Sequence, residues 1–161
     1  MAKALVAYFS SGNEQGVTGR MAARLAGAIG ADLFQITPGV PYTAADLDWQ
    51  DGSSRSSVEM GDRSSRPAIA SRVEDMAQYD TVFVGFPIWW YREPSIVDTF
   101  MESYDFSGKT VVPFATSGMS GIGDSGKNMA ALAPGAKVEV GKRFEASAPA
   151  EKLAAWARAW A

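Results

Sequence analysis

A polar, glycine-containing segment, SSGNEQGVTGR (10–20), directly follows a strand-like run and opens a helical pattern. Ser10, Ser11 and Thr18 supply hydroxyl groups, and the glycines between them let the backbone approach a ligand closely. Backbone N–H groups of such a turn, together with a helix N-terminus, stabilise an anion. The alternative is an ordinary polar loop in which Thr18 is the helix N-cap. The position of the segment between strand and helix favours a phosphate site.

A second unusual segment is GFPIWWYREP (85–94), in which Pro87 stops an apolar run. Trp89, Trp90 and Tyr91 follow almost at once. Indole faces stack on extended π systems and bury large areas. Assignment to the protein core fits one of the two tryptophans but not both, since they are adjacent at a strand end. The segment therefore predicts a wall for a flat aromatic ligand, and which indole faces that ligand stays open.

A third segment, TSGMSGIG (116–123), combines small hydroxyl side chains with three glycines. Such glycines let backbone amides read the edge of a flat heterocycle by hydrogen bonds. The alternative is a flexible loop before a helix. The overlapping stretch GIGDSGKN (121–128) nearly matches the phosphate-binding loop of nucleotide hydrolases, but Asn128 stands where a magnesium-binding hydroxyl is required. We therefore expect no ATP or GTP hydrolysis.

Composition limits the chemistry of this 161-residue chain. It has no histidine and no cysteine, which excludes Ser-His-Asp and Cys-His hydrolysis and thiolate metal sites. We expect no catalytic side chain and no metal, so that a bound cofactor carries the chemistry of any enzyme activity. The net charge of −3, without a basic cluster, argues against nucleic acid. No apolar run reaches the roughly 18 residues of a membrane span, and we expect a cytoplasmic protein.

Strand-like and helical patterns alternate along the chain. The strands are predicted at 3–9, 31–36, 80–86, 109–115 and 136–144, and the helices at 18–29, 67–78, 94–104, 124–132 and 149–160. This alternation predicts one doubly wound α/β domain over 1–161, whose ligands bind beyond the carboxyl ends of the strands. The segments 10–20, 85–94 and 116–123 lie at those ends.

One segment, 38–66, shows no sustained periodicity and is too long for an ordinary connection of about 2–6 residues. It is either a flexible surface excursion or a functional lid. Its arginines lie among acidic residues, and we expect the opposite charges to neutralise one another on a solvent-exposed face.

Together, the three loops describe a ligand with an anionic end and a flat aromatic end, and flavin mononucleotide (FMN) matches both. The chain resembles the flavodoxin family, specifically a branch of short single-domain flavodoxin-like proteins. The resemblance rests on VAYFS (6–10), GFPIWW (85–90), YDFSGKTVVPFATSG (104–118) and SGIG (120–123), and it extends to PYTAADLDW (41–49) and SRSSVEM (54–60).

The resemblance implies a flavodoxin-like fold with a five-stranded parallel sheet in the order 2-1-3-4-5, helices on both faces, and tightly bound FMN. It places the phosphate on Ser10, Ser11 and Thr18. Two alignments of this loop stay open, with either Gly12-Asn13 or Gly16-Val17-Thr18 at the glycine step, and the second keeps the helix start in register. The ring would lie against Pro87, Ile88, Trp89 and Trp90, and its polar edge against Thr116, Ser117, Gly118 and Gly123. Tyr91 and Gly121, which belong to the same two loops, are further candidates for cofactor binding.

Two functions share this scaffold. The preferred one is a low-potential electron carrier that meets redox partner proteins transiently as a monomer or weak dimer, since aromatic stacking and a cation-free pocket lower the potential of the flavin. The alternative is an FMN-dependent NAD(P)H oxidoreductase that reduces quinones or similar acceptors, with the 38–66 segment forming a substrate site. A flavin-free interaction module is the third and least favoured interpretation.

Overall fold

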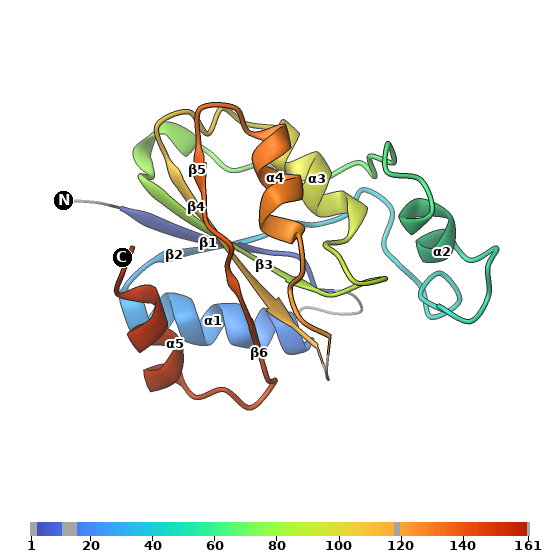
Figure 1. Ribbon diagram of the computed structural model, residues 1–161, viewed down its shortest axis with the longest axis horizontal. Helices are drawn as coiled ribbons and strands as arrows, with labels where there is room; N and C mark the ends of the chain where they lie inside the picture. Colours follow the sequence, from blue (N-terminus) through green and yellow to red (C-terminus); the bar gives the residue numbers. More distant parts are fainter. Residues whose placement is uncertain (1–2, 11–15, 118–119, 161) are drawn as a thin grey trace.

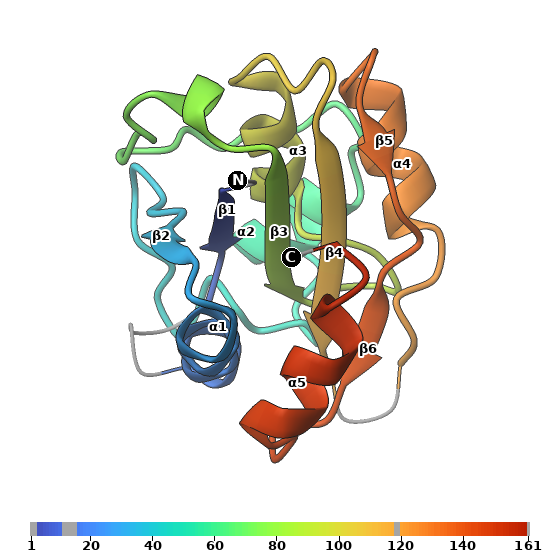
Figure 2. The ribbon, with the colours of Figure 1, turned by 90° about the vertical axis from the view of Figure 1, so that its left-hand side faces the viewer.

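The computed structural model describes residues 3–10, 16–117 and 120–160. A parallel sheet runs through its centre in the order β2-β1-β3-β4-β5, and β6 also pairs with β4 (Figures 1 and 2). The strands are β1 (Ala4–Tyr8), β2 (Asp32–Gln35), β3 (Thr81–Pro87), β4 (Thr110–Thr116), β5 (Lys137–Val138) and β6 (Lys142–Phe144). The sequence-based prediction of a flavodoxin-like parallel sheet in the order 2-1-3-4-5 is confirmed.

Helices cover both faces of the sheet (Figure 1). On one face lie α1 (Val17–Ile29) and α5 (Ala150–Ala157), and on the other lie α3 (Ser95–Glu102) and α4 (Ser125–Leu132). The short helix α2 (Arg55–Met60) projects from the sheet within the long connection between β2 and β3, which also contains the 3-10 helix η1 (Met76–Gln78).

The central strands are apolar throughout because they are buried on both faces. In β1, Leu5 and Ala7 belong to the core under α3 and α4, whereas Val6 and Tyr8 belong to the core under α1 and α5. Alternate side chains of a strand point to opposite faces, so each central strand contributes to both cores. The carboxyl ends of β1, β3 and β4 then meet at one edge of the sheet, where Pro87 lies opposite Thr116.

The predicted fifth strand, 136–144, is divided into β5 and β6. β5 pairs with β4 at Thr110 and Val111, and β6 pairs with it from Phe114 onward, with one extra residue between them. Pro113 lies at the interruption, and a proline cannot donate a hydrogen bond to the neighbouring strand. Gly141 restarts the pairing with φ +82°.

The predicted helix over 67–78 is wrong except for η1. The backbone there closes the base of the 38–66 segment instead: the N–H of Gly39 donates to the carbonyl of Ala68, and that of Ala70 to the carbonyl of Thr37. Pro38 and Ile69 form an antiparallel bridge. These extended contacts use backbone groups that a helix would need, while Val73 and Met76 still reach the core.

The 38–66 segment packs against the rest of the fold. Tyr42 and Met60 are buried, and Ser54 caps α2 by accepting a hydrogen bond from the N–H of Ser57. Among its arginines, Arg55 pairs with Glu59 at 3.0 Å, and Arg66 pairs with Glu102 on α3. None of the helices in the described part of the chain is long and apolar enough to cross a membrane.

Candidate functional site

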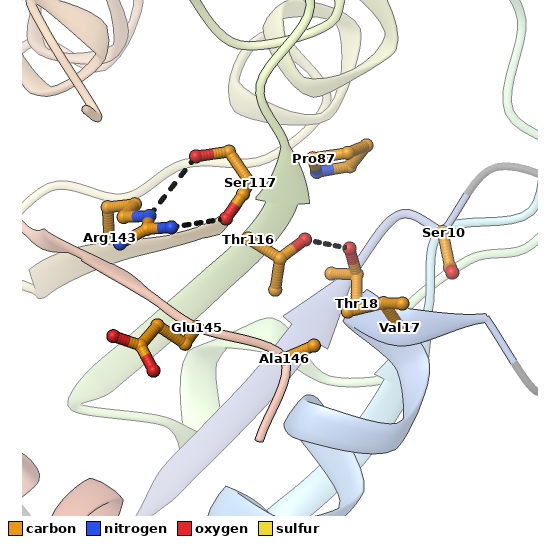
Figure 3. A pocket seen from close by; sticks show the side chains of 9 residues that line it. All are labelled: Ser10, Val17, Thr18, Pro87, Thr116, Ser117, Arg143, Glu145 and Ala146. Atoms are coloured by element: carbon orange, nitrogen blue, oxygen red, sulfur yellow. Dashed lines mark hydrogen bonds between the residues drawn. The ribbon is translucent and has the colours of Figure 1, made fainter. Parts of the chain in front are cut away.

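A cavity of about 450 Å³ opens at the carboxyl edge of the sheet (Figure 3). It is lined by Ser10, Val17, Thr18, Pro87, Thr116, Ser117, Arg143, Glu145 and Ala146. Six of these residues, from Ser10 to Ser117, were predicted from the sequence. The ends of β1, β3, β4 and β6 and the start of α1 therefore meet around one space, which we name the sheet-edge cavity.

The start of α1 gives the sheet-edge cavity its anion-binding character. Gly16 occupies the N-cap without a side-chain cap, and the first turn contains no acidic residue. The first N–H groups of a helix have no partner within the helix, and the helix dipole adds positive potential there. Thr18 is therefore not the N-cap, and Gly16-Val17-Thr18 is the triplet at the helix start.

The hydroxyl of Thr18 forms a hydrogen bond within the protein. Its Oγ1 lies 2.8 Å from Oγ1 of Thr116, and both side chains are buried. This hydrogen bond fixes the first turn of α1 against the end of β4 at the wall of the cavity, which both residues line. Thr18 thus positions the helix start through its side chain.

Arg143 was missed by the sequence analysis. It comes from β6, donates to the carbonyl oxygen of Ser117 at 2.6 Å and to Oγ of Ser117 at 3.2 Å, and lines the cavity with Glu145 (Figure 3). The expectation of a cation-free pocket is therefore wrong at this residue. The available signal was its place at the carboxyl end of the last strand, where doubly wound folds bind ligands.

A second cavity, of about 520 Å³, lies along the 87–91 loop and is named the aromatic cavity. It is lined by Leu47, Trp49, Ser56, Ile88, Trp89, Trp90, Tyr91 and Ser120. The 38–66 segment supplies the first three, which were not predicted individually. Pro87 lines the sheet-edge cavity and the next residue, Ile88, lines the aromatic cavity. Ser117 and Ser120 also line one cavity each and are joined by a hydrogen bond, so the two cavities are neighbours.

The aromatic residues occupy an unusual tight turn. Trp89 and Arg92 exchange backbone hydrogen bonds of 3.0 and 3.1 Å, and the two residues between them have positive φ, +46° at Trp90 and +67° at Tyr91. This is the geometry of a type I′ turn, which normally carries asparagine and glycine. Bulky residues held in this conformation are strained, and such strain concentrates at functional sites.

The turn separates the roles of the two tryptophans. Trp89 packs edge-on against Phe9 and Tyr42, with ring centroids 5.6 and 5.5 Å apart. Trp90 is 41% exposed and Tyr91 is 80% exposed. Trp89 thus packs against the core while lining the aromatic cavity, and Trp90 exposes its indole at the same cavity.

The remaining predicted residues lie as follows. Ser11, Gly12, Asn13 and Gly118 are outside the described residues. Gly121 is exposed and lines neither cavity in the described part of the chain. Gly123 adopts φ +58°, and a Cβ atom there would lie 3.2 Å from the carbonyl oxygen of Tyr91. Gly123 therefore lets the 120–123 loop pass under the aromatic turn.

A buried charged cluster lies directly behind the turn. Arg92 is 3.8 Å from Glu93 and 3.6 Å from Asp98, and Asn128 donates to Oε1 of Glu93 at 3.1 Å. Burial raises the pKa of Asp98 to about 8, and the adjacent Glu93 adds to this rise. Oε2 of Glu93 lies beyond hydrogen-bond distance of Arg92, and neither this atom nor Oδ1 of Asp98 has a hydrogen-bond donor among the described residues. The side-chain hydrogen bond with Glu93 that helps to raise the pKa of Asp98 therefore requires a proton on one of the two carboxyl groups. Asn128, the last residue of the near match to a nucleotide-binding loop, thus serves a structural contact.

Taken as chemistry, the two cavities offer hydroxyls and helix N–H groups at one end and aromatic faces at the other. Ser56 is buried, lines the aromatic cavity, and its Oγ has no hydrogen-bond partner among the described residues. The described residues contain no group of three or more carboxylates placed to hold a metal ion. Such a site can bind and orient a ligand, and it contains no Ser-His or Cys-His pair, since histidine and cysteine are missing from the chain.

Comparisons with known proteins agree with this geometry. A flavodoxin family model matches residues 3–160. A candidate flavoprotein from Bacteroides eggerthii is 46% identical, with a TM-score of 0.88 over 99% of this chain and 98% of that one. Another from Bacteroides uniformis is 47% identical, with a TM-score of 0.89 over 98% of both chains.

A more distant structure is a flavoprotein from Lactobacillus acidophilus in complex with FMN, 18% identical with a TM-score of 0.63, which covers 90% of this chain and 91% of its own. At that identity the likeness concerns the fold. No curated protein matches the chain. The family model spans nearly the whole sequence and the two Bacteroides proteins are similar over their full lengths, so the chain belongs to the flavodoxin family.

Proposed function

We propose that this protein binds FMN non-covalently and carries electrons between redox partner proteins. The observation that carries the proposal is the pair of adjoining cavities, one with anion-binding character and one with aromatic walls. FMN has a phosphate at one end and a flat ring system at the other. When bound, FMN accepts and releases electrons at its ring system, and the protein supplies binding and orientation.

The residues of the site fit FMN. The uncapped start of α1, with Ser10 beside it, takes the phosphate, because helix N–H groups and hydroxyls donate to phosphate oxygens. Trp90 stacks on the ring. The unpartnered hydroxyl of Ser56 faces the aromatic cavity and donates to a polar atom of the ligand there. Membership of the flavodoxin family and the FMN complex of the Lactobacillus acidophilus protein support the same cofactor.

Transfer to a partner protein requires that the ring edge be reached from outside. Tyr91 and Trp49, which border the aromatic cavity, are 80% and 69% exposed. Exposed aromatic residues around a cofactor edge suit a transient interface, since they are favoured at protein contacts. The aromatic wall favours a low potential by disfavouring negative charge on the reduced ring, whereas Arg143 acts in the opposite direction.

A second function, an FMN-dependent NAD(P)H oxidoreductase acting on quinones or similar acceptors, is favoured by one observation. The 38–66 segment packs against the sheet and contributes Leu47, Trp49 and Ser56 to the aromatic cavity. A wall of this kind shelters the space over the ring face, where a nicotinamide or quinone would stack. The carrier remains our first proposal, because no cluster of cations for a dinucleotide phosphate borders this cavity among the described residues.

One anaerobic experiment tests both functions. The purified protein is loaded with FMN and mixed with NADH or NADPH, and the loss of the oxidised flavin absorbance is followed. A carrier bleaches slowly with either nucleotide and rapidly with a reduced flavodoxin reductase. Rapid bleaching followed by repeated turnover with a quinone would replace the carrier by the oxidoreductase. Failure to bind FMN would overturn both.

A further inference from the structure

We propose that Arg143 is a cofactor-binding residue that holds a positive charge at the polar edge of the flavin ring and stabilises the ring when it is reduced. The inference rests on the proposed binding of FMN and adds to it a residue and a direction of effect on the potential. It also runs against the cation-free pocket expected from the sequence.

The strand β6 determines where Arg143 points. Arg143 lies opposite Ala115 and Phe144 lies opposite Thr116 in the parallel pairing with β4. Phe144 is buried in the core under α1 and α5. Because neighbouring side chains of a strand point to opposite faces, Arg143 leaves the sheet on the other face and reaches the loop that follows β4.

The guanidinium of Arg143 is held in place by two hydrogen bonds to Ser117. Nη2 donates to the carbonyl oxygen of Ser117 at 2.6 Å, and Nε donates to Oγ of Ser117 at 3.2 Å. Oγ of Ser117 in turn donates to the carbonyl oxygen of Ser120. The planar, permanently charged guanidinium is thus preorganised, half-buried, and placed at the border of the sheet-edge cavity.

The position of Arg143 distinguishes the two ends of the ligand. The phosphate end lies at Ser10 and the start of α1, whereas Arg143 is on the far side of Thr116, beside Ser117 (Figure 3). Ser117 lines the sheet-edge cavity, Ser120 lines the aromatic cavity, and Oγ of Ser117 donates to the carbonyl oxygen of Ser120, so Arg143 lies on the side of the cavity next to the aromatic one. The cation therefore faces the polar edge of the ring rather than the phosphate.

A fixed cation stabilises negative charge that develops nearby, and it does so most where water is partly excluded. Reduction adds electrons to the ring, so Arg143 increases the affinity for reduced FMN more than that for oxidised FMN. Glu145 lines the same cavity and acts with the opposite sign, although it is exposed and therefore more strongly screened. The two residues predict opposite shifts of the potential on neutralisation.

The test compares Arg143→Gln and Arg143→Lys with a matched control, Lys142→Gln, which removes one positive charge from the adjacent, exposed residue. Dissociation constants are measured for FMN and riboflavin, each oxidised and after reduction with dithionite. We expect Arg143→Gln to weaken binding of reduced flavin at least tenfold more than that of oxidised flavin, equally for FMN and riboflavin. A tenfold difference lowers the two-electron potential by about 30 mV. Arg143→Lys and Lys142→Gln should show less than a threefold difference.

Two results would overturn the inference. Equal weakening of both oxidation states would mean that Arg143 only holds the 117–120 loop, and weakening confined to FMN would make it a phosphate ligand. If Arg143→Gln does not fold, Glu145→Gln provides the test. This variant should bind reduced flavin more tightly, relative to oxidised flavin, than the wild type does. An unchanged ratio of the two dissociation constants would contradict the inference. Wild-type protein that binds neither flavin would instead overturn the proposed function.

Discussion

Thr18 and Thr116, 98 residues apart in the chain, share a buried hydrogen bond of 2.8 Å between their hydroxyl oxygens. Thr18 stands in the first turn of α1, and Thr116 ends β4. The bond joins the helix start that would hold the phosphate to the strand end that leads into the ring-binding loop. The two ends of the proposed cofactor site are therefore mechanically connected through one pair of side chains.

Removing one hydroxyl of this pair should destabilise the fold. Thr18→Val leaves Oγ1 of Thr116 buried without its partner, and an unsatisfied buried hydroxyl costs about 1–3 kcal/mol. We expect the free energy of unfolding, measured with urea, to fall by that amount. The double variant Thr18→Val/Thr116→Val should lose less than the sum of the two single variants. Strict additivity would show that the hydrogen bond contributes nothing.

Relieving the strain of the turn at Trp90 and Tyr91 should stabilise the protein. Tyr91 is 80% exposed and has φ +67°, so Tyr91→Gly relieves the left-handed strain without exposing core surface. We expect the apoprotein to gain about 0.5–1 kcal/mol of stability, the strain of about 1–2 kcal/mol less the chain entropy that glycine adds to the unfolded state. Gly52→Ala is the matched control in open space, where the effect should be within about 0.5 kcal/mol. A destabilised Tyr91→Gly variant would show that the side chain itself makes contacts that matter.

Trp90 should matter for the ligand rather than for the fold. Trp90→Ala removes the exposed indole of the aromatic cavity, and base–aromatic stacking of comparable area contributes about 1–3 kcal/mol per ring. The dissociation constant for FMN should therefore rise by a factor of about 5 to 150, and the potential should shift. Trp90→Phe should retain most of the affinity. Unchanged affinity in Trp90→Ala would remove this residue from the site.

The start of β6 tolerates no side chain at Gly141. Its φ is +82°, and an added Cβ would lie 2.2 Å from the carbonyl oxygen of Pro113. Gly141→Ala should lower the free energy of unfolding by more than about 2 kcal/mol, from the clash and the left-handed strain together. It should also disturb Arg143, two residues further on. Thermal unfolding with Gly121→Ala as control, a site with no atom within 4 Å, measures the difference.

The buried carboxyl pair predicts how stability depends on pH. The pKa of Asp98 is about 8 in the folded protein, because of burial and the neighbouring Glu93, and near the ordinary aspartate value of 3.8 in the unfolded chain. Between these values the unfolded chain has lost a proton that the folded chain keeps, so stability falls as pH rises. Arg92 and Arg66 act against the rise of the pKa of Asp98. The free energy of unfolding falls by at most about 1.4 kcal/mol per pH unit.

The variant Asp98→Asn isolates this effect, since an amide donates to Glu93 without titrating. The stability of the wild type relative to Asp98→Asn, measured by urea unfolding from pH 5 to pH 9, should decrease steadily and level off above about pH 8. Below the unfolded pKa the contribution is fully present. A difference that stays flat over this range would show that the two carboxyl groups do not share a proton.

The strand order was predicted from the resemblance to the flavodoxin family, whereas the apolar runs of the central strands predicted a parallel sheet buried on both faces. The division of the last strand was not predicted, since it depends on Pro113 lying beside the edge strand in space. The helix predicted over 67–78 failed for a similar reason. Its apolar stripe at Val73 and Met76 is real, but the backbone before it pairs with 37–39, a contact that no local pattern reveals.

The candidate site was predicted where it follows strand ends in sequence. Thr18, Pro87, Thr116 and the 88–91 loop all border the two cavities. Arg143 and Trp49 were missed, because one depends on the register of the divided fifth strand and the other on the packing of the 38–66 segment. The roles of the two tryptophans depend on the type I′ turn, whose sequence, Trp-Tyr, is atypical of that turn.

Whether the two cavities hold one FMN is measured by titrating the apoprotein with FMN and with riboflavin while flavin fluorescence is followed. We expect quenching that saturates at one FMN per chain, with FMN bound at least tenfold more tightly than riboflavin because the start of α1 holds the phosphate. Fluorescence that does not change on addition of either flavin would contradict this expectation.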